Sequence, residues 1–259
     1  MIKIDNIHQF NNTFLSLISK VCDNVCLKID SKKIYSITSS SDNTIVIFST
    51  FMQENEIDPT EPITGDRSVD SSGSSCIRLN IPDISRLMRI LGCISDTSIT
   101  LDVDSNCIKY KTPSMRFKYH LLEDGIISVP AVSIRKIKQL DFKYSFNINK
   151  TDVLSLIKGS SLVADVDKLY FSVENAHVYA EITDKETSNT DSFAQKVAET
   201  YTGEGEFEQM SINFEILRII SGLRFENIKV RVNTDVNVLM FETIIDTVKH
   251  NFICTTYVR

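Results

Sequence analysis

Two arginines near the middle of the chain could bind phosphate groups. Arg86 and Arg89 lie in a stretch where apolar residues recur with the period of a helix. These apolar residues are Ile84, Leu87, Met88 and Leu91. The spacing predicts a helix that starts near Pro82, ends near Gly92 and directs both guanidinium groups away from its apolar side. Guanidinium groups pair with phosphate oxygens, so this face could meet a polyanion. An ordinary solvated helix face has the same pattern, and spacing alone does not separate the two.

The other reactive residue types form no recognisable catalytic or metal site. Cys22 and Cys26 are spaced as CxxxC, but no second pair and no nearby histidine completes a tetrahedral set of ligands. The four histidines are isolated, and the sequence contains no GxSxG, no HExxH and no phosphate-binding loop. We therefore expect buried free thiols, no metal, no cofactor and no enzymatic activity.

The bulk composition limits the class of protein. A chain of 259 residues with 42% hydrophobic residues can bury a sizeable core as one large domain or two ordinary ones. No apolar run is long enough to cross a membrane, and the first residues lack a signal-peptide core, so we expect an intracellular protein with no membrane partner. The formal net charge of −6 excludes a chain that is basic throughout, but not one with a local basic surface.

Four helices and many strands must hold these residues in place. The patterns predict helices at residues 7–22, 82–92, after Asn149, and at 213–223. Between them they predict strands, two polar loops at residues 52–75 and 184–205, and an extended surface linker at 122–139. In the helix after Asn149 we expect Leu154 to point inward.

The order of these elements repeats. The string LSLI occurs at residues 15–18 and again at residues 154–157, and each half runs helix, three strands, loop, strand, helix, three strands. Few helices among many strands predict antiparallel sheets backed by helices on one side, an α+β fold. We expect an N-terminal domain at residues 1–122, a connecting loop at 123–140 and a C-terminal domain at 141–259.

Three strings resemble the sliding DNA clamps of the proliferating cell nuclear antigen family. They are LNIPDISRLMRILG, ITSSSDNTIVIF and VLMFE, and the likeness extends over the whole chain. The resemblance implies a DNA-clamp fold whose two similar domains assemble into a closed ring, a homotrimer. Such a ring would encircle double-stranded DNA without sequence specificity and would bind a DNA polymerase and a clamp loader at the site of replication, in the nucleus or, for a viral protein, in the host cell.

The resemblance also implies which residues would face DNA. A sliding ring needs phosphate attraction without lasting contact to any base, so its lining should be basic and non-specific. The expected DNA-facing residues are Lys20, Arg86, Arg89, Lys150, Lys158 and Arg218.

Ring closure would pair two strands of neighbouring subunits, at residues 114–121 and 177–184. Arg116 and Lys118 on one strand could meet Glu181 and Asp184 on the other, although these charges could equally be solvated. The expected interface residues are Arg116, Phe117, Lys118, Tyr119, Tyr179, Glu181 and Thr183.

Partner proteins would insert an aromatic-bearing segment beneath the linker. The expected contact residues are Ile45, Ile47, Ile126, Val129, Pro130 and Ile253, with Val236 and Leu239 as weaker candidates. The strand residues could instead be ordinary core residues. That alternative explains the linker residues less well, because apolar residues in a surface linker without periodicity are not expected to belong to a core. Two further functions share the fold: a processivity factor that acts without ring closure, and a docking platform in transcription or checkpoint signalling.

Overall fold

The structure is a computed structural model that describes residues 1–30, 32–53, 67–69, 75–104, 106–163, 167–187 and 190–256. Most of the polar loop predicted at residues 52–75 lies outside the described residues. The chain forms two compact units. The first contains residues 1–38, 48–133 and 244–249, and the second contains residues 39–47, 134–243 and 250–259.

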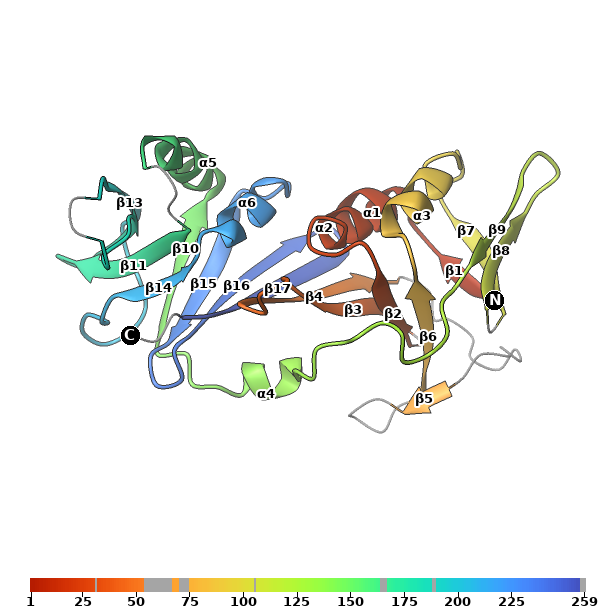
Figure 1. The fold of residues 1–259 in the computed structure, drawn as a ribbon, viewed down its shortest axis with the longest axis horizontal. Helices are drawn as coiled ribbons and strands as arrows, with labels where there is room; N and C mark the ends of the chain where they lie inside the picture. Colours follow the sequence, from red (N-terminus) through yellow and green to blue (C-terminus); the bar gives the residue numbers. More distant parts are fainter. Residues whose placement is uncertain are drawn as a thin grey trace. The chain divides into compact units, whose positions relative to one another are not determined.

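The first unit holds a helical segment, a second helix and two antiparallel sheets (Figure 1). One sheet has the order β1-β7-β8-β9, and β3, β2, β6 and β5 are neighbours in the other. The helices are α1 (Ile7–Gln9), the π-helical η1 (Phe10–Leu15), α2 (Ser16–Ile18) and α3 (Ile84–Leu91). The strands are β1 (Ile2–Ile4), β2 (Val25–Ile29), β3 (Lys33–Ser39), β5 (Arg67–Val69), β6 (Ser75–Ile81), β7 (Ile99–Asp104), β8 (Cys107–Lys111) and β9 (Arg116–His120).

The second unit repeats this plan. One sheet has the order β13-β12-β11-β14, and β10, β15 and β16 are neighbours in the other. The helices are α4 (Ile134–Lys138), α5 (Lys150–Gly159), the 3-10 turn η2 (Ser160–Leu162) and α6 (Glu215–Ser221). The strands are β10 (Tyr144–Asn149), β11 (Lys168–Glu174), β12 (His177–Ile182), β13 (Phe193–Ala198), β14 (Met210–Asn213), β15 (Asn227–Asn233) and β16 (Val238–Ile245).

Two further strands have residues in both units. Strands β4 (Ile45–Met52) and β17 (Val248–Thr255) are hydrogen-bonded neighbours. In the first unit the Met52 N–H donates to the Thr247 carbonyl at 2.9 Å, and in the second the Thr255 N–H donates to the Thr44 carbonyl at 3.2 Å. Each unit is therefore built from several separate segments of the chain, whereas each domain expected from sequence is one continuous segment. Those expected boundaries remain a prediction.

Strand order makes the repeat explicit. The series β1-β7-β8-β9 has its counterpart in β10-β15-β16-β17, because in each series a strand before the first helix pairs with the strand after the second helix. The series β4-β3-β2-β6 likewise corresponds to β13-β12-β11-β14. It follows that β9 is the counterpart of β17, and β13 is the counterpart of β4.

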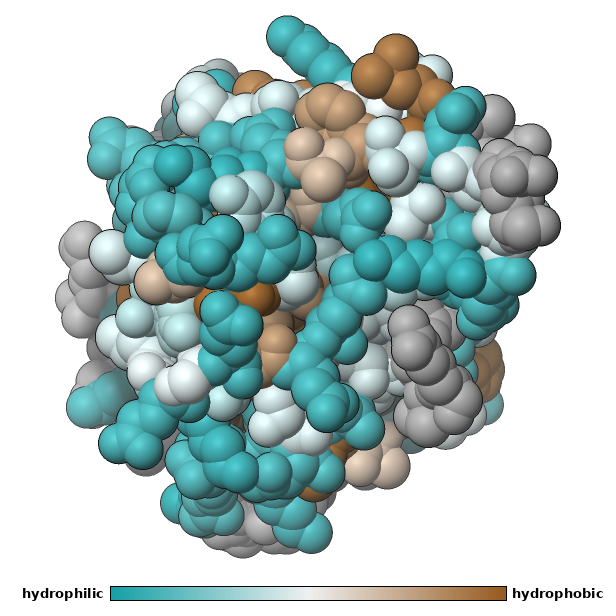
Figure 2. Space-filling model, turned by 90° about the vertical axis from the view of Figure 1, so that its left-hand side faces the viewer, coloured by the Kyte–Doolittle hydropathy of each residue, from teal (hydrophilic) through white to brown (hydrophobic). Residues whose placement is uncertain are grey.

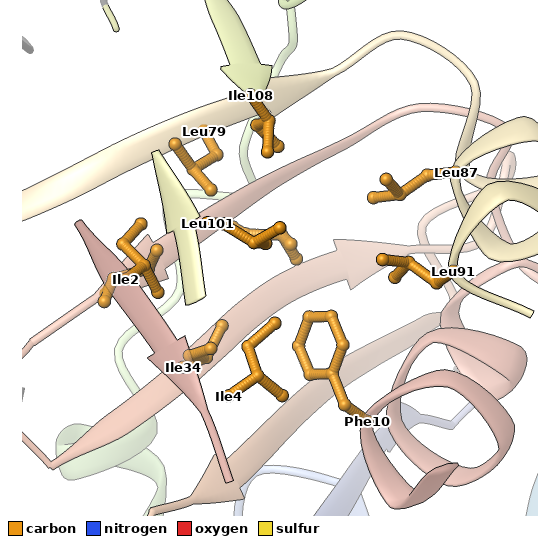
Figure 3. Close-up of a pocket in the computed structure, with 11 residues that line it drawn as sticks. Ile2, Ile4, Phe10, Ile34, Leu79, Leu87, Leu91, Leu101 and Ile108 are labelled. Atoms are coloured by element: carbon orange, nitrogen blue, oxygen red, sulfur yellow. The ribbon is translucent and has the colours of Figure 1, made fainter. Parts of the chain in front are cut away.

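The core of the first unit lies between its helices and its sheets. Phe10, Leu87 and Leu91 project from η1 and α3 toward strand residues such as Ile4 and Leu101 (Figure 3). Among them lies an apolar cavity of about 20 Å³. A void of this size could hold one water only if polar partners lined it, and its lining is apolar. We therefore regard it as a packing gap and not as a ligand site.

Several local predictions were wrong. The helix expected at residues 7–22 includes a π-helical segment and ends at Ile18. The linker contains α4, and the polar loop at 184–205 contains β13. The order of the repeat implied a strand at the place of β14, but no residue range was predicted for it. Leu154 is 42% exposed, because the buried side of α5 is formed by Val153, Leu156 and Gly159.

A buried histidine on β17 makes stability depend on pH. His250 has no exposed surface, and burial lowers its pKa from 6.5 to about 3. Below pH 6.5 the unfolded chain therefore binds a proton that the folded chain does not bind, and stability falls as pH falls. Between pH 7.5 and 5.5 this residue should cost about 1.4 kcal/mol of unfolding free energy.

Urea unfolding at those two pH values measures the effect. His250→Gln, which cannot titrate, should lose less stability over this interval than the wild type by about that amount, whatever its stability at pH 7.5. Equal losses in both proteins would contradict the assignment, since carboxylates common to both would then explain the whole pH dependence.

Candidate nucleic-acid and partner interfaces

Helix α3 is held at its N-cap residue, Asp83, which lies directly before the helix. The Asp83 carboxylate accepts a hydrogen bond from the Arg86 N–H at 2.7 Å, which caps the helix. The Tyr119 hydroxyl, on β9, donates to the Asp83 carbonyl at 2.6 Å and accepts from its N–H at 3.1 Å. At the other end, the Asn11 amide of η1 donates to the Met88 carbonyl at 3.2 Å. These contacts fix both the position and the rotation of α3.

The fixed rotation places the two arginines at the surface. Ile84, Leu87 and Leu91 are buried, whereas Arg86 and Arg89 are exposed on the other side. Neither guanidinium group makes an ion pair with another described residue. Two unpaired guanidinium groups three residues apart suit binding to phosphates. Lys20, in the turn after α2 of the same unit, is also exposed.

Lys150 has a structural task that the sequence did not reveal. Its ammonium group donates hydrogen bonds to the carbonyls of Ser221 and Leu223, the second at 2.5 Å, and lies 4.7 Å from the centre of the Phe225 ring. A cation that binds the last carbonyls of a helix also interacts favourably with the helix dipole. The expectation that Lys150 reaches for DNA is therefore corrected, because its charge is used at the end of α6.

The other predicted cations of the second unit differ in availability. Arg218 forms an ion pair with Glu215 at 2.9 Å, so its charge is largely compensated. Lys158 on α5 is exposed, and among the described residues its ammonium group has no ion-pair partner. It lies between two exposed leucines, Leu154 and Leu162. The available positive charge is therefore greater on α3 than on α5 and α6.

The view of the protein from the end where β11 and β13 lie shows a mainly hydrophilic surface (Figure 2). Hydrophobic side chains form small separate patches in this view and no continuous apolar face. Scattered apolar side chains of this kind are normal on a protein surface.

One of the two predicted interface strands lies at a sheet edge and the other does not. β9 has one hydrogen-bonded neighbour, β8, and its Arg116 and Lys118 are exposed while Phe117 is half-buried. Tyr119 is buried and holds α3, so it is not available to a partner. β12, by contrast, is paired on both sides, with β11 and β13. The prediction that residues 177–184 pair with the next subunit is wrong, because β12 has no free edge; the edge strand beside it is β13.

The residues predicted on β12 are occupied within the chain. The Glu181 carboxylate lies 2.6 Å from the Lys185 ammonium group, and Asp184 lies 3.8 Å from that of Lys168. Thr183, just after β12, is buried and donates to the Asp191 carbonyl at 3.2 Å, and Tyr179 lies opposite Lys196 of β13. These contacts remove the physical basis for the expected pairing of Arg116 and Lys118 with Glu181 and Asp184.

Side chains and short segments satisfy other strand edges. The Gln53 amide accepts from the Asp5 N–H at 3.2 Å and donates to the Lys3 carbonyl at 2.6 Å, so it occupies the outer edge of β1. Ser145 of β10 exchanges backbone hydrogen bonds with Thr202 at 2.9 and 2.8 Å. Strands β9 and β13 are the ends of their sheets, and no described segment pairs with their outer sides.

The residues predicted to contact partner proteins fall into a buried group and an exposed group. Ile45, Ile47 and Ile253 are buried, as the core alternative expects. Ile126 is 60% exposed, and Val129 and Pro130 are half-exposed. Of the weaker candidates, Val236 is 52% exposed and Leu239 is buried. The accessible apolar residues are therefore those of the linker and the turn that carries Val236.

No catalytic constellation is found in the described part of the chain. Its His, Cys, Asp and Glu residues include no group of three that could hold a metal ion. Burial raises the pKa of Cys22 to about 11 and also raises that of Cys254, which disfavours the reactive thiolate. Within the same residues, no helix has the length and apolarity needed to cross a membrane.

Two solved structures match the chain over its whole length. The proliferating cellular nuclear antigen of Entamoeba histolytica matches with a TM-score of 0.69 and 13% identity, over 99% of this chain and 98% of that one. The PCNA of A. fulgidus, in a structure with the C-terminal region of FEN-1 bound, matches with a TM-score of 0.71 and 14% identity, over 100% and 99%. The chain has the fold of a PCNA clamp. No family model and no curated protein sequence matches it.

The PCNA-like fold confirms the fold class and the resemblance expected from sequence. Sequence reasoning missed the edge strand β13, the amide of Gln53 and the basic helix α4. The string FAQKVA of β13 does not alternate apolar and polar residues, so it carries no clear strand signal. Gln53 gave no sequence signal, because its role depends on a strand almost 50 residues away.

The contrast between Lys150 and Lys158 can be tested by unfolding. Lys150→Met should lower the free energy of unfolding by about 1–3 kcal/mol, because two carbonyls at the end of α6 lose a charged donor. Lys158→Met, on the same helix and with the same loss of charge, should change it by less than about 0.5 kcal/mol. Equal effects in urea titrations would contradict the capping role of Lys150.

Proposed function

We propose that this protein is a DNA sliding clamp, a ring that encircles duplex DNA and tethers a DNA polymerase and other replication proteins. The observation that carries the proposal is the match of the entire chain to PCNA structures, at both ends and over both units. The arginines of α3 are exposed and have no ion-pair partner in the part of the chain that the structure describes, so they supply what such a ring needs, which is attraction to phosphates without reading bases. In this function the chain performs no chemistry and acts at the site of DNA replication.

The set of residues proposed to face DNA is smaller than the set expected from sequence. Arg86, Arg89, Lys20 and Lys158 are exposed, and none has an ion-pair partner in the described residues. Arg218 is a weaker candidate because Glu215 compensates its charge, and Lys150 is excluded by its role at α6. The first unit would then contribute more of the phosphate attraction than the second.

The internal repeat supports head-to-tail assembly. Within one chain, β17 pairs with β4. The counterparts of these strands are β9 and β13, which end their sheets. If β9 of one copy pairs with β13 of the next, the joint between copies repeats the joint within a copy, and both β9 and β13 gain a partner. We propose this pairing, with three copies closing the ring as in the family that the sequence resembles.

Partner proteins are proposed to bind at the linker. Ile126, Val129 and Pro130 are the exposed or half-exposed apolar residues there. The A. fulgidus PCNA that shares this fold is bound to a C-terminal region of FEN-1. This supports recognition of a terminal segment of a partner, while the identities of the polymerase and the loader are left to experiment.

Removing the α3 arginines should weaken DNA binding. Arg86→Ala with Arg89→Ala should raise the dissociation constant for a 30-base-pair duplex and make its salt dependence shallower, by about 0.9 in the log–log slope for each phosphate group that is no longer neutralised. Fluorescence anisotropy between 50 and 200 mM salt measures both quantities. The matched control, Arg135→Ala with Lys136→Ala, removes the same charge from α4. Equal weakening by both pairs would contradict a specific role for α3.

A proline on β9 should prevent assembly without unfolding the chain. The Leu121 N–H donates to Asn106 at 2.8 Å and the Thr112 N–H to Met115 at 2.7 Å, so odd-numbered residues of β9 direct their N–H groups to β8. The Lys118 N–H therefore points to the open edge. Lys118→Pro should remove one bond to the next copy, whereas Lys118→Ala keeps it.

Light scattering measures the number of chains in each variant. The wild type and Lys118→Ala should contain three chains, and Lys118→Pro should be monomeric with an unchanged circular dichroism spectrum. A wild type that is monomeric at micromolar concentration would contradict the ring and favour a processivity factor that acts without closure. A trimeric Lys118→Pro would show that β9 is not the joint.

A further inference from the structure

Helix α4 concentrates positive charge on an acidic protein. Its five residues, IRKIK, include Arg135, Lys136 and Lys138 and no carboxylate, whereas the whole chain has a formal net charge of −6. All three basic side chains are exposed. The side chains of Arg135 and Lys136 make no hydrogen bond or ion pair with the other described residues. Within the described residues, the charges of Arg135 and Lys136 are therefore not used to hold the fold together.

The same helix has an incompletely covered apolar side. Ile134 and Ile137 are three residues apart, which places them on one side of the helix, and both are only half-buried. No residue of α4 is buried. A five-residue helix is not stable through its own hydrogen bonds, and little packing supports this one, so a bound partner could stabilise it.

The location of α4 separates it from the helices proposed to meet DNA. Within the second unit, α4 lies on the opposite side of β15 and β16 from α5 and α6 (Figure 1). A duplex bound along α5 and α6 would not reach it. The helix spans about 7.5 Å, which matches a few residues of a peptide better than the long phosphate track from which nucleic-acid binding gains its affinity.

We propose that α4 is a docking site for an acidic segment of a partner protein, in which carboxylates pair with Arg135 and Lys136 and an apolar residue covers Ile134 and Ile137. The ion pairs of Arg135 and Lys136 with carboxylates would orient the peptide and speed its association, and the apolar contact with Ile134 and Ile137 would add affinity. The inference specifies the chemistry of a partner for the proposed clamp, but the peptide contact itself does not require that DNA be bound or that the ring be closed.

A labelled peptide tests the proposal. The probe is a fluorescein-labelled 12-residue peptide with six Glu, three Leu and three Ser, and its control has Gln in place of every Glu. Wild-type protein in 100 mM salt should bind the Glu peptide at least tenfold more tightly than the Gln peptide. Arg135→Glu with Lys136→Glu should weaken binding of the Glu peptide at least tenfold, and added salt should weaken wild-type binding.

A matched variant separates local from overall charge. Lys111→Glu with Lys229→Glu makes the same change at exposed positions of β8 and β15 and should alter peptide affinity less than threefold. Equal loss in both variants, equal affinity for the two peptides, or no binding at 1 mM would overturn the proposal. So would tighter binding of a 12-nucleotide DNA, lost on charge reversal of α4, which would assign this helix to nucleic acid.

The two proposals fail differently. If the clamp function is wrong, the wild type will not bind duplex DNA, while the peptide result is unaffected. If only the peptide site is wrong, Arg135→Glu with Lys136→Glu will bind duplex DNA like the wild type and neither will distinguish the Glu peptide from the Gln peptide.

Discussion

A strand at the edge of a sheet leaves backbone N–H and C=O groups without partners, and the organisation of this protein depends on how each edge is satisfied. The amide of Gln53 occupies the edge of β1, and Thr202 pairs with Ser145 beside β10. Strands β17 and β4 pair with each other. Of the strands that still end a sheet, β9 and β13 are the counterparts of that pair. An internal repeat with one joint made and an equivalent joint left open has the geometry of a subunit that extends by adding copies of itself.

The same elements that leave β9 at an edge also position the candidate DNA surface. Tyr119 belongs to β9, yet its hydroxyl group holds the N-cap residue of α3 through the backbone N–H and carbonyl of Asp83. Its neighbour Lys118 directs its N–H to the open edge. Adjacent residues of one strand therefore serve two purposes, because successive residues of a strand point in opposite directions.

The sequence predicted the fold better than it predicted the site. The period of the apolar residues identified α3 within the predicted range 82–92, since this pattern reflects local burial. The order of the elements and a few strings were enough to indicate the clamp fold. The edge strand β13 was not predicted, because its residues show no apolar alternation and its place in the sheet depends on its pairing with β12. Lys150 was misassigned for a similar reason. The residues around a lysine do not show whether it binds carbonyls at the end of a helix 71 residues away or faces solvent.

Net charge is the last constraint, and it decides how the basic residues can act. The chain carries a formal charge of −6, so a polyanion at a distance is repelled on average, and binding must rely on local groups within about a Debye length, roughly 8–10 Å at physiological salt. Ion pairing within the chain removes Arg218 from this role, and helix capping removes Lys150. Among the described helices, the cations left uncompensated are Arg86 and Arg89 on α3, Lys158 on α5, and Arg135 and Lys136 on α4. Because α4 lies across β15 and β16 from α5, its cations cannot serve the same ligand as Lys158. Two separate basic surfaces on an acidic protein imply two anionic ligands, and this is the physical reason for assigning α4 to a second ligand and not to DNA.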